Sequence, residues 1–224
     1  MCARTTLTLS AHLIARWLAL HDVPPWEPRY NVCPTQDQLA VRLRNGEPEA
    51  VPLRWGLVPS WASDLTVGAR MINARGETVG AKPAFCDAFR SRRCMILVDG
   101  FYEWQAIPGA KRKVPHAVRM TGGTPFVLAG LWESWNAKGA VEAVETCTIV
   151  TTAANALLAP IHDRMPVILD PSAYGVWLDP TTPSAVASAM LRPYDGPGLC
   201  AYPVSTYVNS PAHGDAQCLE PVAA

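Results

Sequence analysis

The stretch RCMILVDGFYEWQ (residues 93–105) carries the clearest strand–turn–strand pattern in the chain. Residues 95–98 form an unbroken apolar run, typical of a strand buried on both faces. Asp99 and Gly100 form a dipeptide favoured in two-residue hairpin turns. Residues 101–104 are rich in aromatic side chains, which favour strands. We therefore expect a β-hairpin here, in a fold dominated by strands.

Similar patterns lie on both sides of this stretch. Further strands are predicted at QLAVRL (38–43), EAVPLRWGLVPSW (49–61), HAVRM (116–120), PFVLAGLWESW (125–135) and ETCTIVTTAA (145–154), and the turn RNGEP (44–48) joins the first two. Short helices are predicted at SAHLIARWLAL (10–20, with Ser10 as N-cap and Leu13, Ile14, Trp17 and Leu18 on one face), PSAYGVWL (171–178) and PSAVASAMLR (183–192). CAYPVSTYVN (200–209) should end the ordered part. We expect one compact domain over residues 2–210, α+β or mostly β, with a closed sheet and short peripheral helices, and a C-terminal tail over residues 211–224.

The composition indicates a globular protein and argues against a zinc site, a signal peptide and a membrane span. The 224 residues are 49% hydrophobic and carry 19 basic and 19 acidic side chains, so any basic surface must come from local clustering. The seven cysteines include no CxxC pair, which argues against a zinc site, and their odd number indicates a reducing compartment. His12 and Arg16 interrupt the apolar stretch at residues 7–20, so we predict neither a signal peptide nor a membrane span. We therefore expect a cytoplasmic protein.

Cys2 follows the initiator methionine directly. A small second residue permits removal of Met1, which would leave an α-amine and a thiol on neighbouring carbons. Such a 1,2-aminothiol is a specific reagent for aldehydes. The alternative interpretation is that Cys2 is simply one of seven cysteines.

Three more polar groups stand in apolar or turn-rich surroundings. In INARGET (72–78), Asn73 and Arg75 alternate and can share one strand face, where Arg offers a planar fork for phosphate. Glu103 lies between two aromatic residues, where burial would raise its pKa toward neutrality and suit acid–base work. His162 in IHDRMP (161–166) is suited to proton transfer near neutral pH. The alternatives are a turn Asn with a surface Arg, a solvent-facing Glu and a structural His.

Aromatic and cationic residues are interleaved between residues 54 and 113, a mixture that binds single-stranded nucleic acid when both kinds reach the surface. The alternative is that the tryptophans belong to the core. The members are Arg54, Trp55, Trp61, Arg70, Arg75, Arg90, Arg92, Arg93, Trp104, Lys111, Arg112 and Lys113.

Nine ordered motifs resemble those of the SOS response-associated peptidase (SRAP) family, whose members are also called abasic-site processing proteins. They are MCAR, YNVCPTQ, RWGLVPSW, INARGET, DGFYEW, AGLWE, TIVTTAA, IHDRMPVIL and PVSTYVN, from residue 2 to about residue 209. The resemblance implies a single α+β domain with a β-barrel-like core and a positively charged groove. It implies a monomer that binds single-stranded DNA containing abasic sites and protects them in the DNA damage response, nucleoid-associated when bound, with no metal or organic cofactor.

The resemblance also implies roles for individual residues. Cys2 matches the family's crosslinking cysteine after removal of Met1, and the resemblance leaves open whether the protein removes Met1 by its own peptidase activity. Asn73, Glu103 and His162 match its other active-site residues. The positions that match family DNA contacts or their neighbours are Arg4, Pro34, Trp61, Arg75, Thr151 and Arg164. This chain reads MCAR where the family usually reads MCGR, and Ala3 would be strained if that position required a positive φ.

The expected chemistry is a Schiff base between the Cys2 amine and the ring-opened abasic aldehyde, closed by the Cys2 thiol to a thiazolidine. Two alternatives stay open on the sequence. One is a cysteine peptidase or hydrolase with Cys2 as nucleophile, His162 as base and Glu103 or Asn73 as orienting residue. The other is a non-enzymatic single-strand binding module.

Overall fold

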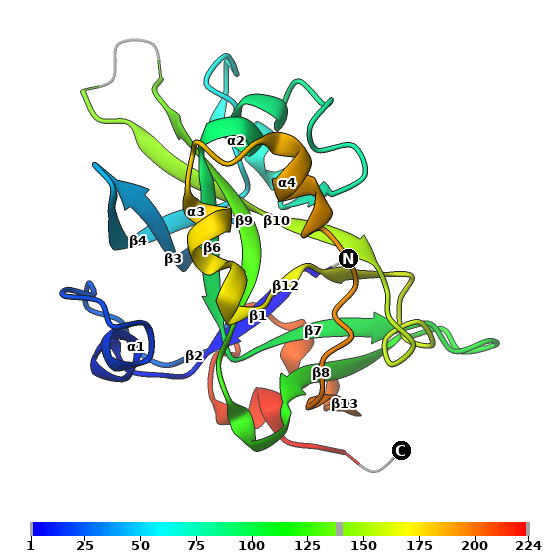
Figure 1. Ribbon diagram of the computed structural model, residues 1–224. Coiled ribbons are helices and arrows are strands. Elements are labelled where there is room, and N and C mark those ends of the chain that lie inside the picture. Colours follow the sequence, from blue (N-terminus) through cyan, green and yellow to red (C-terminus); the bar gives the residue numbers. More distant parts are fainter. Residues whose placement is uncertain (1, 138–140, 223–224) are drawn as a thin grey trace.

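Two β-sheets build the molecule, as the computed structural model in Figure 1 shows; it describes residues 2–137 and 141–222. The smaller sheet is antiparallel, with the strand order β13-β8-β7-β1-β2. Its strands are β1 (Arg4–Leu7), β2 (Arg29–Val32), β7 (Gly100–Gln105), β8 (Val114–Met120) and β13 (Leu199–Pro203).

The larger sheet closes on itself. Its order is β11-β10-β4-β3-β6-β9-β12, and β9 also pairs with β10, so that β10, β4, β3, β6 and β9 form a ring. Its strands are β3 (Asp37–Arg44), β4 (Glu47–Trp55), β5 (Asn73–Arg75), β6 (Arg93–Val98), β9 (Phe126–Trp135), β10 (Val144–Ala153), β11 (Arg164–Pro166) and β12 (Ile168–Leu169). The expected closed sheet with short helices is confirmed, as are the strands predicted at 38–43, 116–120, 125–135 and 145–154. The strand predicted at 49–61 ends at Trp55, and residues 56–61 form no strand.

The hairpin predicted at Asp99 and Gly100 is wrong. β6 pairs with β3 and β9 in the larger sheet, whereas β7 pairs with β1 and β8 in the smaller one. The dipeptide is therefore a corner at which the chain passes from one sheet to the other. By contrast, the turn at Asn45 and Gly46 does join β3 to β4, with φ of 54° and 86°, as a type I′ turn requires.

The Asp99 side chain shows why the corner forms. Its buried carboxylate accepts hydrogen bonds from Thr6 Oγ1 (2.5 Å), the Thr8 backbone N–H (2.9 Å) and the Thr8 hydroxyl, and Arg119 Nη2 lies 3.6 Å away. The carboxylate thus bonds to β1 and to the residue that follows it instead of closing a local turn. Gly100 has no positive φ, but a Cβ there would lie 2.8 Å from Thr6 Oγ1.

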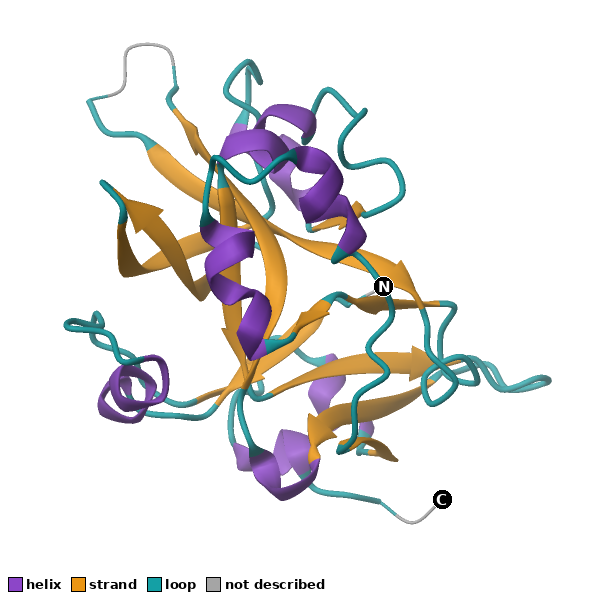
Figure 2. Cartoon of the chain, in the orientation of Figure 1, coloured by secondary structure: helices purple, strands orange, loops and turns teal. Residues whose placement is uncertain are grey.

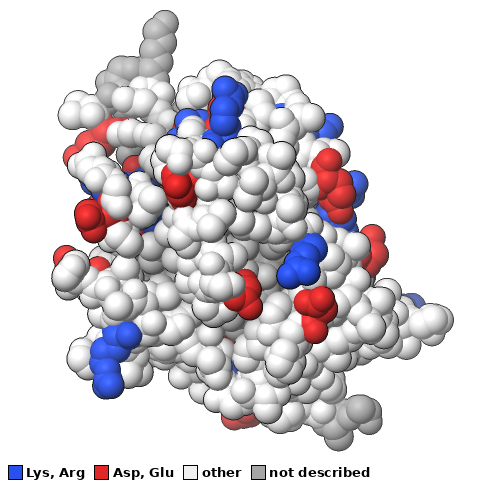
Figure 3. All heavy atoms as spheres, viewed as in Figure 1, with Lys and Arg blue, Asp and Glu red and all other residues white. Residues whose placement is uncertain are grey.

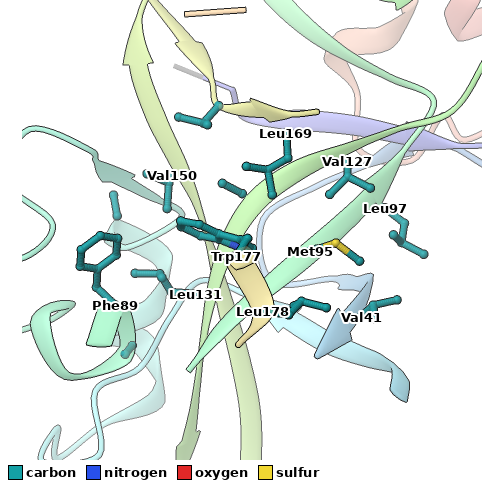
Figure 4. Packing of buried hydrophobic residues seen from close by; sticks show 14 of the residues in the cluster. Val41, Phe89, Met95, Leu97, Val127, Leu131, Val150, Leu169, Trp177 and Leu178 are labelled. Carbon is teal, nitrogen blue, oxygen red and sulfur yellow. The ribbon is translucent and has the colours of Figure 1, made fainter. Parts of the chain in front are cut away.

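The run at residues 95–98 is buried on both faces, as predicted. Met95 and Leu97 belong to a core cluster that also contains Phe89 of α2 (Cys86–Ser91), Trp177 of α3 (Tyr174–Leu178) and Ala187 of α4 (Ser184–Ala189). Figure 4 shows Trp177 at the centre of this packing, and its indole N–H donates to the Cys94 carbonyl at 2.9 Å. Ile96 and Val98 belong to a second cluster. Figure 2 shows the helices at the periphery of the strands.

The N-terminal helix forms as α1 (Ala11–Leu18), but it buries less than expected. Ser10 stands at the N-cap without a side-chain cap bond, Ile14 is fully buried, and Leu13 is 48% exposed. Residues beyond the expected end of order are also packed: a 3₁₀ helix covers Ala216–Leu219, and Cys218 is buried. The domain boundary at residue 210 stays a prediction.

Charges of both signs are scattered over the face shown in Figure 3, with much uncharged surface between them. The expected positively charged groove therefore stays a prediction. Within the parts of the chain that the structure describes, no helix is long and apolar enough to cross a membrane.

Candidate active site

Cys2 lies just before β1, at the junction of the two sheets. β1 pairs with β7 through Arg4 and Tyr102, and continuing this register by one residue brings Ala3 opposite Glu103. Cys2 is fully buried and belongs to the second core cluster, together with Phe101 and Ile149. Antiparallel pairing thus places the start of the chain beside Glu103. Met1, whose removal the sequence predicts, lies outside the described residues.

Asn73 reaches Cys2 from the larger sheet. β5 pairs in parallel with β10, with Asn73 opposite Ile149, and the Asn73 side-chain amide donates a hydrogen bond to the Cys2 carbonyl at 2.7 Å. Its Oδ1 is buried and has no hydrogen-bond partner among the described residues. A buried amide oxygen of this kind can accept a hydrogen bond from a ligand or a nearby amine. Asn73 can therefore both hold the N-terminal residue and accept one further proton donor.

Glu103 is 1% exposed, which agrees with the prediction of a desolvated carboxyl and not with a solvent-facing one. Burial raises its pKa from 4.5 to about 7; among the smaller influences, the charge of Lys113 lowers the pKa and that of Asp163 raises it. A carboxyl group that titrates near neutral pH can both accept and donate a proton under cellular conditions. Glu103 is therefore the acid–base candidate of this site.

His162 comes from the segment between β10 and β11. Gln105 of β7 holds this segment through a hydrogen bond to the Pro160 carbonyl at 3.1 Å. The Arg164 backbone N–H donates to His162 Nδ1 at 3.0 Å, which requires that this nitrogen be unprotonated. The Asp163 carboxylate, 2.9 Å from the same nitrogen, favours a proton there, but burial outweighs it and lowers the His162 pKa. At neutral pH His162 is therefore a neutral imidazole.

The Cys2 thiol is not a ready thiolate. Burial raises its pKa strongly, and the negative charge of Glu103 raises it further. Reactive thiolates in hydrolases instead lie near positive charge, which lowers their pKa. This environment disfavours chemistry that begins with the sulfur.

Arg75 and Arg164 lie on strands that flank the end of β10. Arg75 in β5 is opposite Thr151, and Arg164 in β11 is opposite Ala153. Arg75 is exposed, whereas the side chain of Arg164 is 14% exposed and makes a bidentate pair with Glu77 at 2.5 and 2.9 Å. Thr151 is buried and accepts from Arg164 Nη2 through its carbonyl (2.8 Å) and hydroxyl (3.3 Å). The structure thus brings these three predicted residues together.

The other predicted DNA contacts lie elsewhere. The guanidinium of Arg4 donates to Asn31 Oδ1 (2.8 Å) and to the carbonyls of Val208 (2.8 Å) and Asn209 (3.0 Å), so it fastens the C-terminal segment. Pro34 is half-buried in the loop after β2. Trp61 follows β4 and is 65% exposed, which leaves its ring open for stacking on a base.

Comparison with known proteins identifies the family. The sequence model described as "SOS response associated peptidase (SRAP)" matches residues 1–211. The chain belongs to this family. It is 40% identical to the abasic site processing protein YoqW of Bacillus subtilis, over 98% of this chain and 99% of that protein. It is 29% identical to the abasic site processing protein HMCES of Gallus gallus, over 99% of this chain and 78% of that protein.

Solved structures share the SRAP fold. A protein from Bacteroides thetaiotaomicron matches with a TM-score of 0.84 at 24% identity, over 99% of this chain and all of that chain. A phage-related protein from Bordetella bronchiseptica matches with a TM-score of 0.71 at 30% identity, over 91% of this chain and 94% of that one.

The departure of this SRAP chain at Ala3 causes no backbone strain. The non-glycine residues with positive φ are Ala19, Thr35 and Asn45 among those described, so residue 3 does not need the conformation that favours glycine. Alanine therefore fits the start of β1.

Sequence reasoning missed Glu77 and named Lys113 only as one of the interleaved cations, not as a neighbour of Glu103 and His162. Glu77 lies inside the INARGET motif, and its position two residues after Arg75 was the available signal. Lys113, whose charge lowers the pKa of both Glu103 and His162, ends a run of three cations. No group of three or more His, Cys, Asp and Glu side chains in the described parts of the chain could hold a metal ion.

Proposed function

We propose that this protein binds single-stranded DNA and forms a covalent thiazolidine crosslink with ring-opened abasic sites through Cys2, once Met1 is removed. One observation carries the proposal: the Cys2 carbonyl is held by the Asn73 amide at 2.7 Å, and the neighbouring Glu103 is a buried carboxyl whose pKa is about 7. The names of the relatives, abasic site processing proteins, support the substrate.

The reaction begins with the amine. An α-amine has a pKa of about 7.7–8.0, so a useful fraction is neutral at cellular pH. Its nitrogen attacks the C1′ aldehyde carbon and forms a carbinolamine, which loses water to give an imine. The Cys2 sulfur then bonds to the imine carbon while the thiol proton moves to nitrogen. One water is released overall, and the product is a five-membered ring.

Ring closure protects the DNA strand, because it removes the imine that would otherwise promote β-elimination at the sugar. Closure is intramolecular, so the thiol needs no separate encounter with the carbon. The raised pKa of the Cys2 thiol fits this order, in which the amine reacts first and the sulfur second. The same pKa argues against the alternative of a cysteine hydrolase that uses a thiolate.

Glu103 and His162 would move the protons. Glu103 takes a proton from the Cys2 ammonium, which frees the neutral amine to attack. It then gives that proton to the carbinolamine hydroxyl, which leaves as water; a pKa of about 7 suits both steps. His162 assists sugar ring opening as a neutral imidazole. Asn73 orients Cys2, and its buried Oδ1 is an acceptor for the new amine.

DNA binding would use groups around this centre. Arg75 and Arg164 contact phosphates on either side of the abasic position. Farther along the strand, the exposed ring of Trp61 stacks on a base, and Pro34 is a further expected contact. Arg4, whose donors serve the C-terminal segment here, supports the site by anchoring β1.

The test combines a denaturing gel with intact mass measurement. Purified protein is incubated with a single-stranded oligonucleotide that contains one abasic site. We expect loss of Met1 and a heat-stable adduct whose mass equals protein plus DNA minus one water. An unprocessed amino terminus or Cys2→Ala should abolish the adduct, whereas Cys86→Ala, at a half-exposed cysteine of α2, should not.

Three outcomes decide between the candidates. A normal adduct from a protein with a blocked amino terminus would refute the amine mechanism. Peptide cleavage without any adduct would favour the hydrolase. Binding of the oligonucleotide with neither adduct nor cleavage would leave a binding module. Cleavage of Met1 by the protein itself is measured separately, with purified unprocessed chain and no other enzyme present.

A further inference from the structure

Glu77 covers the arginine expected to hold a DNA phosphate. Its two carboxylate oxygens lie 2.5 and 2.9 Å from Nη1 and Nη2 of Arg164. The Glu77 side chain is 52% exposed and that of Arg164 is 14% exposed. A ligand that arrives from solvent therefore meets the carboxylate before it meets the guanidinium.

Most N–H groups of the Arg164 guanidinium are already used or buried, so few are available to a ligand. A guanidinium has five N–H groups. Nη2 donates to Glu77 and Thr151, and Nη1 donates to Glu77. The Nε–H is buried and has no partner among the described residues. Two N–H groups are left, the buried Nε–H and one on Nη1, and they do not belong to the same fork. A phosphate therefore cannot form a bidentate contact with Arg164 while Glu77 stays in place.

The surroundings would keep Arg164 in position if Glu77 moved away. The Thr151 carbonyl and hydroxyl both accept from Nη2, and the same carbonyl accepts from the Gly76 N–H at 2.8 Å. Arg75 lies two residues before Glu77 and its charge also acts on that carboxylate, so one acidic group lies within reach of both predicted phosphate contacts.

We propose that the Glu77 carboxylate occupies the place of a DNA phosphate at the Arg164 fork. A backbone phosphate of the bound strand displaces this carboxylate. This inference rests on the proposed function, because it assumes that the strand reaches Arg164. Binding at this point is an exchange of anions, and it occurs only with a ligand that brings a phosphate to the fork. Glu77 thereby weakens binding of strands that do not place a phosphate there.

The test is Glu77→Gln, which keeps the shape and removes the charge. Binding of an unmodified single-stranded oligonucleotide is measured by fluorescence anisotropy over a series of salt concentrations, for the full chain. We expect affinity to rise about three- to five-fold at low salt, the range of a partly exposed ion pair. The slope of log affinity against log salt should steepen by about 0.7, the value for one more neutralised phosphate on a single strand.

Two further variants separate this effect from a general change in charge. Glu47→Gln removes one negative charge at the exposed β3–β4 turn and should change the affinity much less. In an Arg164→Gln background, Glu77→Gln should lose its effect, because the fork that it covers is gone. Thermal unfolding confirms that each variant is folded.

Each outcome decides the matter. Weaker binding by folded Glu77→Gln would show that Glu77 holds Arg164 for the ligand. An unchanged affinity and slope would show that the Glu77 carboxylate does not limit access of the strand to Arg164. Both results overturn the exchange. The same holds if the effect persists without Arg164. If neither the wild type nor the variant binds the oligonucleotide, the proposed function fails as well, which separates that failure from the others.

Discussion

Replacing Glu103 by Gln should stabilise the protein at alkaline pH while it removes activity. The fold raises the pKa of this carboxyl from 4.5 to about 7, so the folded state favours its protonated form. Between these two values the unfolded chain ionises while the folded chain stays protonated, and stability falls as pH rises. At about 1.4 kcal/mol per pKa unit, the loss reaches about 3 kcal/mol above pH 7.

Glutamine cannot ionise, so the variant escapes this loss. Urea unfolding of both proteins at about pH 4.5, 6, 7 and 8 gives the difference in their free energies of unfolding. This difference should grow by about 3 kcal/mol in favour of Glu103→Gln from the lowest to the highest pH, because other titrating groups contribute equally to both proteins.

The crosslinking rate should change in the opposite sense. Loss of the acid–base group should lower the rate about 10²-fold or more, and the inflection near pH 7 should vanish from the pH profile. Stability curves of wild type and variant that run parallel over the whole pH range would refute the raised pKa. A variant that crosslinks at the wild-type rate would remove Glu103 from the mechanism even if the stability result holds.

Three shorter predictions follow from other contacts. Gly100→Ala should cost about 1–3 kcal/mol, because its Cβ would lie 2.8 Å from Thr6 Oγ1; an unchanged urea midpoint would contradict the close packing of the corner. Cys2→Ser keeps the amine and loses the thiol, so it should give an adduct only when borohydride reduces the imine, and a heat-stable adduct without reductant would count against ring closure by sulfur. Arg4→Gln should speed amide hydrogen exchange over residues 206–213, because Arg4 holds the carbonyls of Val208 and Asn209 in that segment; unchanged protection would mean that these two bonds are not what orders it.

Local patterns predicted much of the secondary structure, because strand and turn signals depend on neighbouring residues. The turn at Asn45 and Gly46 was predictable, since both positions need a positive φ that these residues tolerate. The same reasoning failed at Asp99, where buried bonds to Thr6 and Thr8 outweigh the local preference for a hairpin. Those partners are more than 90 residues away in the chain, so no local pattern could show them.

For the candidate site, too, the sequence predicted some properties and not others. The motifs around Cys2, Asn73, Glu103 and His162 indicated the family and the candidate residues, because the chemistry requires those residue types. Burial of Glu103 was left open, since an alternating strand does not reveal which of its faces is covered. The ion pair between Glu77 and Arg164 could not be predicted either, because these residues are 87 positions apart in the chain.

By itself, then, the sequence determined the residue types at the site, the strand-rich composition and the family, all of which depend on residue identity and order. Tertiary structure alone decided three other properties: the passage from β6 into a second sheet, the near-neutral pKa of Glu103 and the covering of Arg164 by Glu77. Each of these depends on desolvation or on contacts between distant segments. Such energies arise only when the chain is packed, because an isolated strand exposes the same groups to water.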